Sequence, residues 1–273
     1  MQAAVATTIV VTGASSGIGR ELAIQLAAPG REIWLVGRDG GRLDEVADQV
    51  HAKGAVPQIV QLDLSDLDAA ARFLHATFAA DKRVDVVYLA AAITQFGEFK
   101  DTWPGDWKQI YHVNLLSPVQ WALHFYQNMV IEGSGRIVLI SSLCAYAGYP
   151  TATAYATMKA GLLGLFRSLW HEGKAYGVTM HLASPGYVNT SIYRSALYRE
   201  TTYAKTMGEI KSLGFRIISA EKTARIILRS IHRGEREFAL PAYASLMKWA
   251  APRLPMLIDL VHARIVKCFR QAS

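Results

Sequence analysis

The sequence predicts an α/β fold in which a doubly wound parallel sheet is covered by helices on both faces. Short apolar runs rich in β-branched residues alternate with longer segments of helical periodicity. Such alternation requires crossover connections, which keep successive strands parallel and bury both faces of the sheet. No linker or change of composition divides the 273 residues, so we expect one domain over residues 1–241 and a C-terminal helical extension over residues 242–273.

The first strand is predicted at residues 8–12, where Thr-Ile-Val-Val-Thr is a β-branched run typical of a buried strand. Similar runs predict further strands at 32–37, 58–62, 84–89, 136–140, 179–183 and 238–241. Apolar residues at three- and four-residue steps predict helices at 20–28, 43–53, 67–80, 107–131, 153–176 and 221–231. Residues 191–215 are rich in Tyr, Arg and Glu and show no clear period.

Composition narrows the range of partners. Lys and Arg number 29 against 22 Asp and Glu, and 51% of the residues are hydrophobic, which excludes a disordered chain. The basic balance favours an anionic partner, such as a phosphorylated cofactor, an acidic carrier protein or a membrane surface. No basic run or aromatic–basic array suggests nucleic acid. With two cysteines and no visible secretory signal, we expect a reduced, cytoplasmic protein without a metal site.

A glycine-rich loop follows the first predicted strand and precedes the first helix. Glycines permit a sharp turn and let a dinucleotide pyrophosphate approach the backbone, while the helix N-terminus offers free N–H groups. The alternative is a glycine-rich turn that binds nothing, but the strand–loop–helix context favours binding. The predicted phosphate-binding residues are Gly13, Ser15, Ser16, Gly17, Ile18 and Gly19.

The Gly-x3-Gly-x-Gly spacing of this loop resembles the signature of the short-chain dehydrogenase/reductase superfamily, and the resemblance extends over about residues 8–241. It implies a Rossmann-type fold and an NAD(P)-dependent oxidoreductase acting on CH–OH groups. The segments that match the family's active-site motifs imply the catalytic residues Asn114, Ser142, Tyr155 and Lys159. Further cofactor contacts are implied for Asp63, Leu64, Ala90, Tyr155, Lys159, Pro185, Gly186, Val188 and Thr190.

One segment departs from the family pattern. After the fourth strand, Leu89-Ala90-Ala91-Ala92 stands where the family usually has Asn-Asn-Ala-Gly. The three alanines still allow the backbone to approach a cofactor closely. The side-chain amides that brace the central sheet are missing, so the departure concerns local stability more than chemistry.

The residue types in the implied site suit carbonyl reduction. The carbonyl oxygen needs a proton, which a tyrosine hydroxyl can supply, although its ordinary pKa is about 10. Lys159 lies four residues after Tyr155, on the same helix face, so we expect its charge to lower the pKa of Tyr155. Ser142 can hydrogen-bond the substrate oxygen. The resemblance also implies that Lys159 holds the nicotinamide ribose and that Asn114 holds a water linking Lys159 to solvent.

The end of the second strand bears on the choice of cofactor. An NAD-preferring site usually places an acidic residue there, where this chain has Gly37. Arg38 follows and offers a planar fork for a 2′-phosphate, so we predict NADP. The alternative is that Asp39 reaches the ribose and the cofactor is NAD.

The substrate is predicted to be a small apolar carbonyl or alcohol. By the resemblance, Cys144, Tyr149 and Tyr187 line its pocket, and an aromatic lining suits a steroid-, retinoid- or fatty-acyl-like molecule with one reactive oxygen. Cys144 has no evident base beside it, so we interpret it as a pocket-lining residue and not as a nucleophile. Two alternatives remain: a non-catalytic dinucleotide-sensing protein on the same fold, and an enzyme similar to 3-oxoacyl-carrier-protein reductases.

Two features suggest further contacts. Residues 115–131 carry no charge and residues 160–170 carry only Arg167, which predicts a homodimer or tetramer unless the C-terminal tail covers these helices. In the tail, an apolar helical face opposes Asp259, Lys267 and Arg270 and consists of Leu254, Leu257, Ile258, Val261, Ile265, Cys268 and Phe269. We expect this helix to pack over the substrate cleft or across a dimer; the alternative is peripheral membrane contact.

Overall fold

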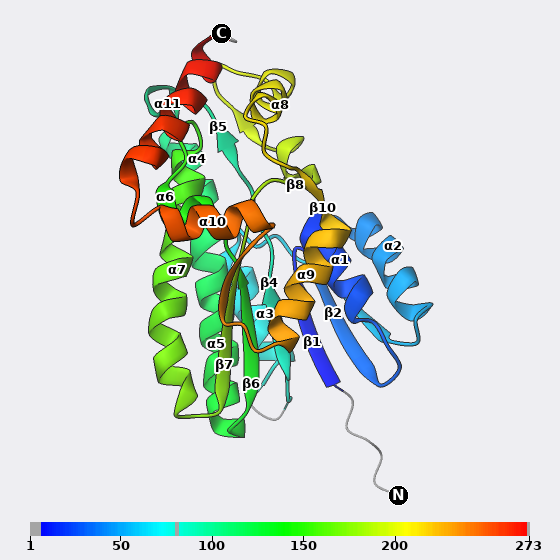
Figure 1. The fold of residues 1–273 in the computed structure, drawn as a ribbon. Coiled ribbons are helices and arrows are strands. Elements are labelled where there is room, and N and C mark those ends of the chain that lie inside the picture. The colour runs from blue at the N-terminus through cyan, green and yellow to red at the C-terminus, as the bar shows by residue number, and fades with distance from the viewer. Residues whose placement is uncertain (1–6, 80–81, 272–273) are drawn as a thin grey trace, which may run out of the picture.

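A parallel sheet forms the centre of the structure, a computed structural model that describes residues 7–79 and 82–271 (Figure 1). Its strands are β1 (Thr7–Thr12), β2 (Arg31–Gly37), β3 (Val56–Gln61), β4 (Val86–Leu89), β6 (Gly135–Ile140), β7 (Val178–Pro185) and β11 (Glu237–Leu240). They lie in the order β11-β7-β6-β4-β1-β2-β3, and every pairing is parallel. The predicted doubly wound sheet is confirmed. Its strand order reverses between β1 and β4, where such sheets bind ligands.

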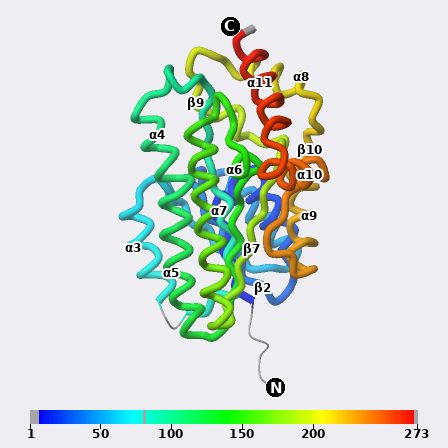
Figure 2. The backbone as a smooth tube through the Cα atoms, turned by 60° about the vertical axis from the view of Figure 1, so that its left-hand side comes forward, coloured from blue at the N-terminus to red at the C-terminus, as the bar shows by residue number. Residues whose placement is uncertain are grey.

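Side-chain alternation along the strands builds a core on each face of the sheet. In β1, Ile9 and Val11 belong to one buried cluster and Val10 to the other, because successive side chains of a strand point to opposite faces. The first cluster packs under α1 (Gly17–Leu26), α2 (Gly40–His51) and α9 (Ala220–His232). The second packs under α3 (Leu67–Thr77), α5 (Ser117–Glu132) and α7 (Thr153–Lys174), which lie side by side in Figure 2. Residue 80, the predicted end of the third helix, lies outside the described residues.

The predicted helix over residues 107–131 is present without a break, but its hydrogen-bonding pattern changes part-way along it. The segment consists of α4 (Pro104–Tyr111), a π-helical turn at His112–Leu116 and α5. The Ser117 N–H donates to the His112 carbonyl, five residues back, and Pro118 has no N–H to donate to the carbonyl four residues before it. Periodicity cannot reveal one extra residue in a turn, and π-turns of this kind are frequent at functional sites.

Residues 191–215, which showed no period, contain short ordered elements. These are η3 (Ser191–Tyr193), β9 (Leu197–Tyr198) and α8 (Tyr203–Ser212). Pairing of β9 with β5 (Gln95–Phe96) ties the segment to a distant part of the chain, and pairing of β8 (Val188–Asn189) with β10 (Ile218–Ser219) joins the residues that flank it. The remaining short elements are η1 (Phe99–Asp101) and α6 (Cys144–Ala147).

An ion pair also anchors this segment. Arg199, directly after β9, forms two hydrogen bonds to the carboxylate of Asp106 on α4, at 2.6 and 2.8 Å. Non-local contacts of this kind leave no periodic signal in the sequence.

The tail forms two helices, α10 (Ala242–Ala250) and α11 (Pro255–Gln271), beyond the carboxyl ends of the strands (Figure 1). Helix α10 lies beside β11, and α11 packs against α8. Of the predicted apolar face, Ile258, Ile265 and Phe269 are buried, whereas Leu254 and Leu257 are exposed. No helix in the described part of the chain combines the length and hydropathy needed to span a bilayer.

Candidate active site

The glycine loop between β1 and α1 is packed tightly against its neighbours. Gly13 has φ +70°, and a Cβ atom there would lie 2.8 Å from the backbone nitrogen of Ala91. A Cβ atom at Gly19 would lie 2.3 Å from the carbonyl oxygen of Gly13. Ser16, at the N-cap of α1, makes no capping hydrogen bond through its side chain, so the first N–H groups of the helix are free to bind an anion. This geometry fits a dinucleotide diphosphate.

The segment that departs from the family pattern is braced in another way. The Thr12 hydroxyl oxygen, at the end of β1, accepts hydrogen bonds from the N–H groups of Ala90 at 3.1 Å and Ala91 at 3.3 Å. The backbone after β4 is therefore held against the glycine loop without the missing amides.

A cleft at the carboxyl ends of the central strands brings together most of the predicted cofactor contacts. The predicted residues that line it are Gly13, Ser16, Gly17, Ile18, Gly19, Ala90, Ser142, Tyr155, Lys159, Pro185, Gly186, Val188 and Thr190. Ser15 lines an adjoining hollow that also holds Arg20, Arg42 and Arg194. Arg38, Asp63 and Leu64 lie outside the cleft lining, after the neighbouring strands β2 and β3.

Tyr155 and Ser142 both line this cleft. Burial raises the pKa of the Tyr155 phenol well above its usual range, and the hydrogen bond with the Ser142 hydroxyl opposes this rise. The phenol is therefore fully protonated at neutral pH and can donate a proton.

Lys159 is buried one helical turn after Tyr155. Its Nζ donates a hydrogen bond of 2.8 Å to the Ile140 carbonyl and lies 5.7 Å from the centre of the Tyr155 ring. Burial lowers the pKa of Lys159 to about 8. The expected low pKa of Tyr155 is not found in this structure, because burial disfavours the phenolate and raises its pKa. Burial likewise disfavours the charged form of Lys159.

Asn114 lies in the π-turn and is fully buried. Its side-chain oxygen accepts from the Ile93 N–H at 2.9 Å, and its side-chain nitrogen donates to the Ile93 carbonyl at 2.8 Å. Asn114 thus holds the loop after β4, and it does not line the cleft. The water-holding role implied by the resemblance stays a prediction.

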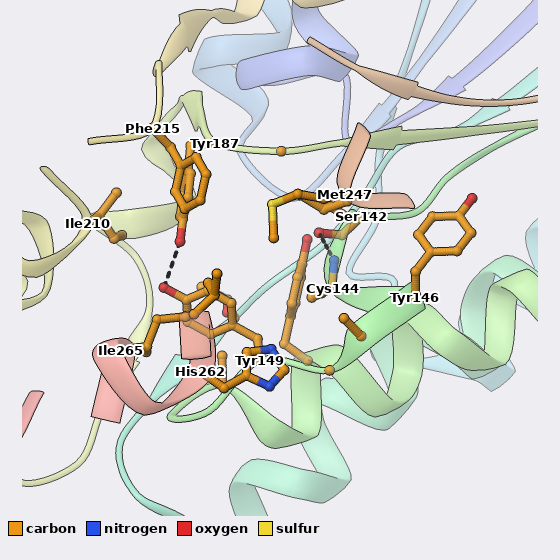
Figure 3. A pocket seen from close by; sticks show the side chains of 18 of the residues that line it. Ser142, Cys144, Tyr146, Tyr149, Tyr187, Ile210, Phe215, Met247, His262 and Ile265 are labelled. Atoms are coloured by element: carbon orange, nitrogen blue, oxygen red, sulfur yellow. Dashed lines mark hydrogen bonds between the residues drawn. The ribbon is translucent and has the colours of Figure 1, made fainter. Parts of the chain in front are cut away.

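A second cavity, apolar and aromatic, adjoins the cleft (Figure 3). The predicted residues Cys144, Tyr149 and Tyr187 all line it. Burial raises the pKa of Cys144 to about 11, so its sulfur stays a thiol and fits a lining role. The hydroxyl groups of Tyr149 and Tyr187 are 2.9 Å apart and hydrogen-bonded.

The tail supplies a wall of this pocket that residue types alone did not identify. Met247 comes from α10, and Val261, His262 and Ile265 come from α11 (Figure 3). The expectation that the tail packs over the substrate cleft agrees with this placement. The apolar helical face of the tail was the sequence feature that could have indicated these lining residues. It does not predict which cavity the face covers.

The sequence matches the family model described as short chain dehydrogenase over residues 7–200. The chain belongs to the short-chain dehydrogenase family. Membership confirms the predicted superfamily and the Rossmann-type fold.

Curated relatives of this short-chain dehydrogenase differ in length and name. It is 31% identical over 195 residues to dehydrogenase/reductase SDR family member 7B of Danio rerio, covering 69% of this chain and 63% of that protein. It is 32% identical over 247 residues to probable oxidoreductase EphD of Mycobacterium bovis, covering 87% of this chain but 42% of that protein. The chain therefore spans less than two thirds of the length of both relatives.

Solved structures of the family share the fold. A short-chain dehydrogenase from Sphingobium yanoikuyae in complex with NADPH superposes with a TM-score of 0.78 at 23% identity, covering 93% of this chain and 95% of that one. A short-chain dehydrogenase/reductase from Burkholderia phymatum in complex with NAD gives 0.79 at 21% identity, with 92% and 95% covered. At these identities the likeness concerns the fold alone.

Proposed function

We propose that this chain is an NADP-dependent oxidoreductase that interconverts an alcohol and a ketone or aldehyde on an apolar substrate. One observation carries the proposal: Ser142 and Tyr155 line both the glycine-loop cleft and the apolar pocket. A cofactor in the first cavity and a substrate in the second would meet at these two hydroxyl groups.

The residues where the two cavities meet have separate roles in carbonyl reduction. When bound, the nicotinamide supplies a hydride or accepts one. The Tyr155 hydroxyl donates a proton to the substrate oxygen during reduction and becomes a phenolate, and the phenolate takes the proton from the alcohol in the reverse reaction. The Ser142 hydroxyl hydrogen-bonds the same oxygen and stabilises its developing charge. Burial keeps Tyr155 protonated at neutral pH, and this is the form that donates a proton during reduction. We assign the ribose contact to Lys159, which lines the cleft.

The preference for NADP rests on Arg38 and Asp39. Arg38 is exposed, and its guanidinium has no hydrogen bond or ion pair within the described residues, so it is free to bind a 2′-phosphate. The Asp39 carboxylate caps α2 by accepting from the Arg42 N–H at 3.2 Å and also pairs with the Arg42 guanidinium at 3.2 Å. An occupied Asp39 is less available to a ribose hydroxyl.

The apolar substrate class rests on the walls of the second cavity. Phe96, Leu143, Ile192, Ile210 and Phe215 line it together with the residues of the tail. Two relatives are the reason to include acyl thioesters among the substrates that are tested. They are acetoacetyl-CoA reductase of Acinetobacter, 31% identical over 182 residues, and 3-oxoacyl-[acyl-carrier-protein] reductase FabG of Aquifex aeolicus, 29% identical over 219 residues.

The deciding experiment measures oxidation of NADPH with a panel of apolar ketones, aldehydes and 3-oxoacyl thioesters. Tyr155→Phe should lower kcat by at least about a hundredfold and leave NADPH affinity within about threefold of wild type. Tyr146→Phe is the matched control, because Tyr146 lines the apolar pocket but not the cleft. Cofactor binding without turnover on any substrate would favour the dinucleotide-sensing alternative, and near-normal turnover by Tyr155→Phe would refute the mechanism.

The cofactor preference has its own test. We expect kcat/KM for NADPH to exceed that for NADH, and Arg38→Ala to reduce the ratio by at least about tenfold through loss of a charge-assisted phosphate contact. Arg42→Ala, which removes the partner of Asp39, is the comparison variant. A ratio that Arg38→Ala leaves unchanged would contradict the assignment.

We further propose that α5 and α7 pair with a second copy of the chain. Leu123 and Ile131 on α5 are exposed, and the tail lies beside β11 and against α8, which supports the predicted oligomer over the alternative that the tail covers these helices. Light scattering at micromolar concentration should report a dimer or tetramer, and a monomer mass would refute the proposal.

A further inference from the structure

Six large apolar side chains are exposed on α10, on α11 and in the turn between them. Figure 1 shows this turn at the end of α10. We call the six side chains the tail patch, and its residues are Leu246, Trp249, Leu254, Met256, Leu257 and Leu260. Met256 and Leu260 are 80% and 69% exposed. Large apolar side chains gathered in this way mark an interaction surface more often than single exposed residues do.

The charges around the tail patch are positive. Residues 242–271 contain five Lys and Arg residues and one acid, Asp259. Of the five, Lys248, Arg253, Arg264 and Arg270 donate hydrogen bonds to protein groups, and Arg253 does so to the Trp249 carbonyl at 3.1 Å. Arg253 lies over the Trp249 ring at the edge of the patch, and Lys267 is exposed further along α11. An apolar surface bordered by exposed cations is complementary to anionic lipid headgroups above an acyl layer.

The same two helices form the wall of the substrate pocket. Met247 of α10 and Val261 and Ile265 of α11 line the pocket, and the patch residues Leu246 and Leu260 each precede one of them in the chain. The patch and the pocket therefore lie on different faces of one pair of helices, so that a lipophilic molecule leaving a bilayer would meet the pocket wall first.

We propose that the tail patch docks the protein on the surface of an anionic phospholipid membrane. Leu246, Trp249, Leu254, Met256, Leu257 and Leu260 enter the interface, while Arg253 and Lys267 contact the headgroups. Docking is peripheral, because neither helix is built to span a bilayer. This surface is distinct from the reacting groups, so its test does not depend on the proposed catalytic activity.

The test is co-sedimentation of the full chain with vesicles of phosphatidylcholine alone or mixed with phosphatidylserine, at low salt. Wild type should bind the mixed vesicles and bind pure phosphatidylcholine less. The double variant Met256→Ser, Leu260→Ser should bind the mixed vesicles at least about tenfold more weakly, because two large apolar side chains no longer leave water. Wild type that stays in the supernatant with both vesicle types would overturn the proposal.

The matched control is Val56→Ser, Ile59→Ser on the edge strand β3, where the exposed fractions are 56% and 44%. This variant should bind vesicles like wild type, and an equal loss of binding would overturn the assignment to the tail patch. Sedimentation velocity without lipid tests the alternative that a second copy of the chain binds the tail patch. If wild type forms a dimer and only the Met256→Ser, Leu260→Ser variant loses it, the patch is an interface between copies and the proposal is wrong.

Two further variants separate docking from damage to the fold. Arg253→Gln, Lys267→Gln leaves the apolar residues in place and should weaken binding to the mixed vesicles several-fold, with no effect on phosphatidylcholine. Trp249→Phe should remove the blue shift of fluorescence that wild type shows when mixed vesicles are added. Unchanged binding by the charge variant, or a blue shift that persists in Trp249→Phe, would count against the proposed contact.

Discussion

Replacing Lys159 with methionine should change how the free energy of unfolding depends on pH, because Lys159 is a buried cation. Its pKa is about 8 in the folded chain, against an ordinary value of 10.5. Burying the ammonium ion therefore costs about 3 kcal/mol near pH 7, at about 1.4 kcal/mol for each pKa unit. The cost arises because Lys159 is buried beside Tyr155 in the cleft.

The sign follows from proton binding. Between the two pKa values, the unfolded chain holds the Lys159 proton and the folded chain has released it. The free energy of unfolding of wild type therefore rises with pH in this range. From about pH 7 to about pH 9.5 the gain from this one group is about 2 kcal/mol. The Lys159→Met variant lacks the group, so the difference between wild type and variant should move by the same amount in favour of wild type.

Urea unfolding followed by tryptophan fluorescence at the two pH values measures this difference. Loss of the hydrogen bond from Lys159 to the Ile140 carbonyl shifts the variant similarly at both pH values and largely cancels. The control is Lys222→Met, which removes an exposed lysine on α9 and should give a difference that does not change with pH. A wild-type minus Lys159→Met difference that stays constant within about 0.5 kcal/mol would refute the reasoning.

Substitutions at three further positions test local structure. Gly19→Ala should weaken NADPH binding at least about tenfold in a fluorescence titration, since its Cβ atom would lie 2.3 Å from the Gly13 carbonyl oxygen; normal affinity would show that the loop adapts. Tyr243→Phe should lower the free energy of unfolding in urea by about 1 kcal/mol, because the Tyr187 N–H loses the hydroxyl acceptor that lies 2.7 Å away. An unchanged unfolding midpoint would show that this hydrogen bond makes no net contribution to stability. Gly133→Ala, at φ +66°, should cost about 1 kcal/mol in the same assay and Gly133→Asn less; equal stabilities would contradict a left-handed cap.

Local patterns account for what the sequence determined by itself. The run of β-branched residues in β1 predicted a buried strand, and the glycine spacing after it predicted the turn into α1. The separation of four residues between Tyr155 and Lys159 predicted that both lie on one face of a helix, and both lie on α7. These features depend on neighbours a few residues apart, where strand and helix geometry decide which side chains share a face.

Tertiary structure decided the features that depend on residues far apart in the chain. The low pKa of Lys159 arises from burial. The hydrogen bonds from the Ala90 and Ala91 N–H groups to the Thr12 hydroxyl join residues that are 78 and 79 positions apart in the chain. The tail was predicted to be amphipathic, but only packing against α8 determines that Ile265 enters the substrate pocket while Leu257 stays exposed. Periodicity shows that a helix has an apolar face, whereas the partner of each side chain on that face is set by the surfaces that the rest of the fold presents.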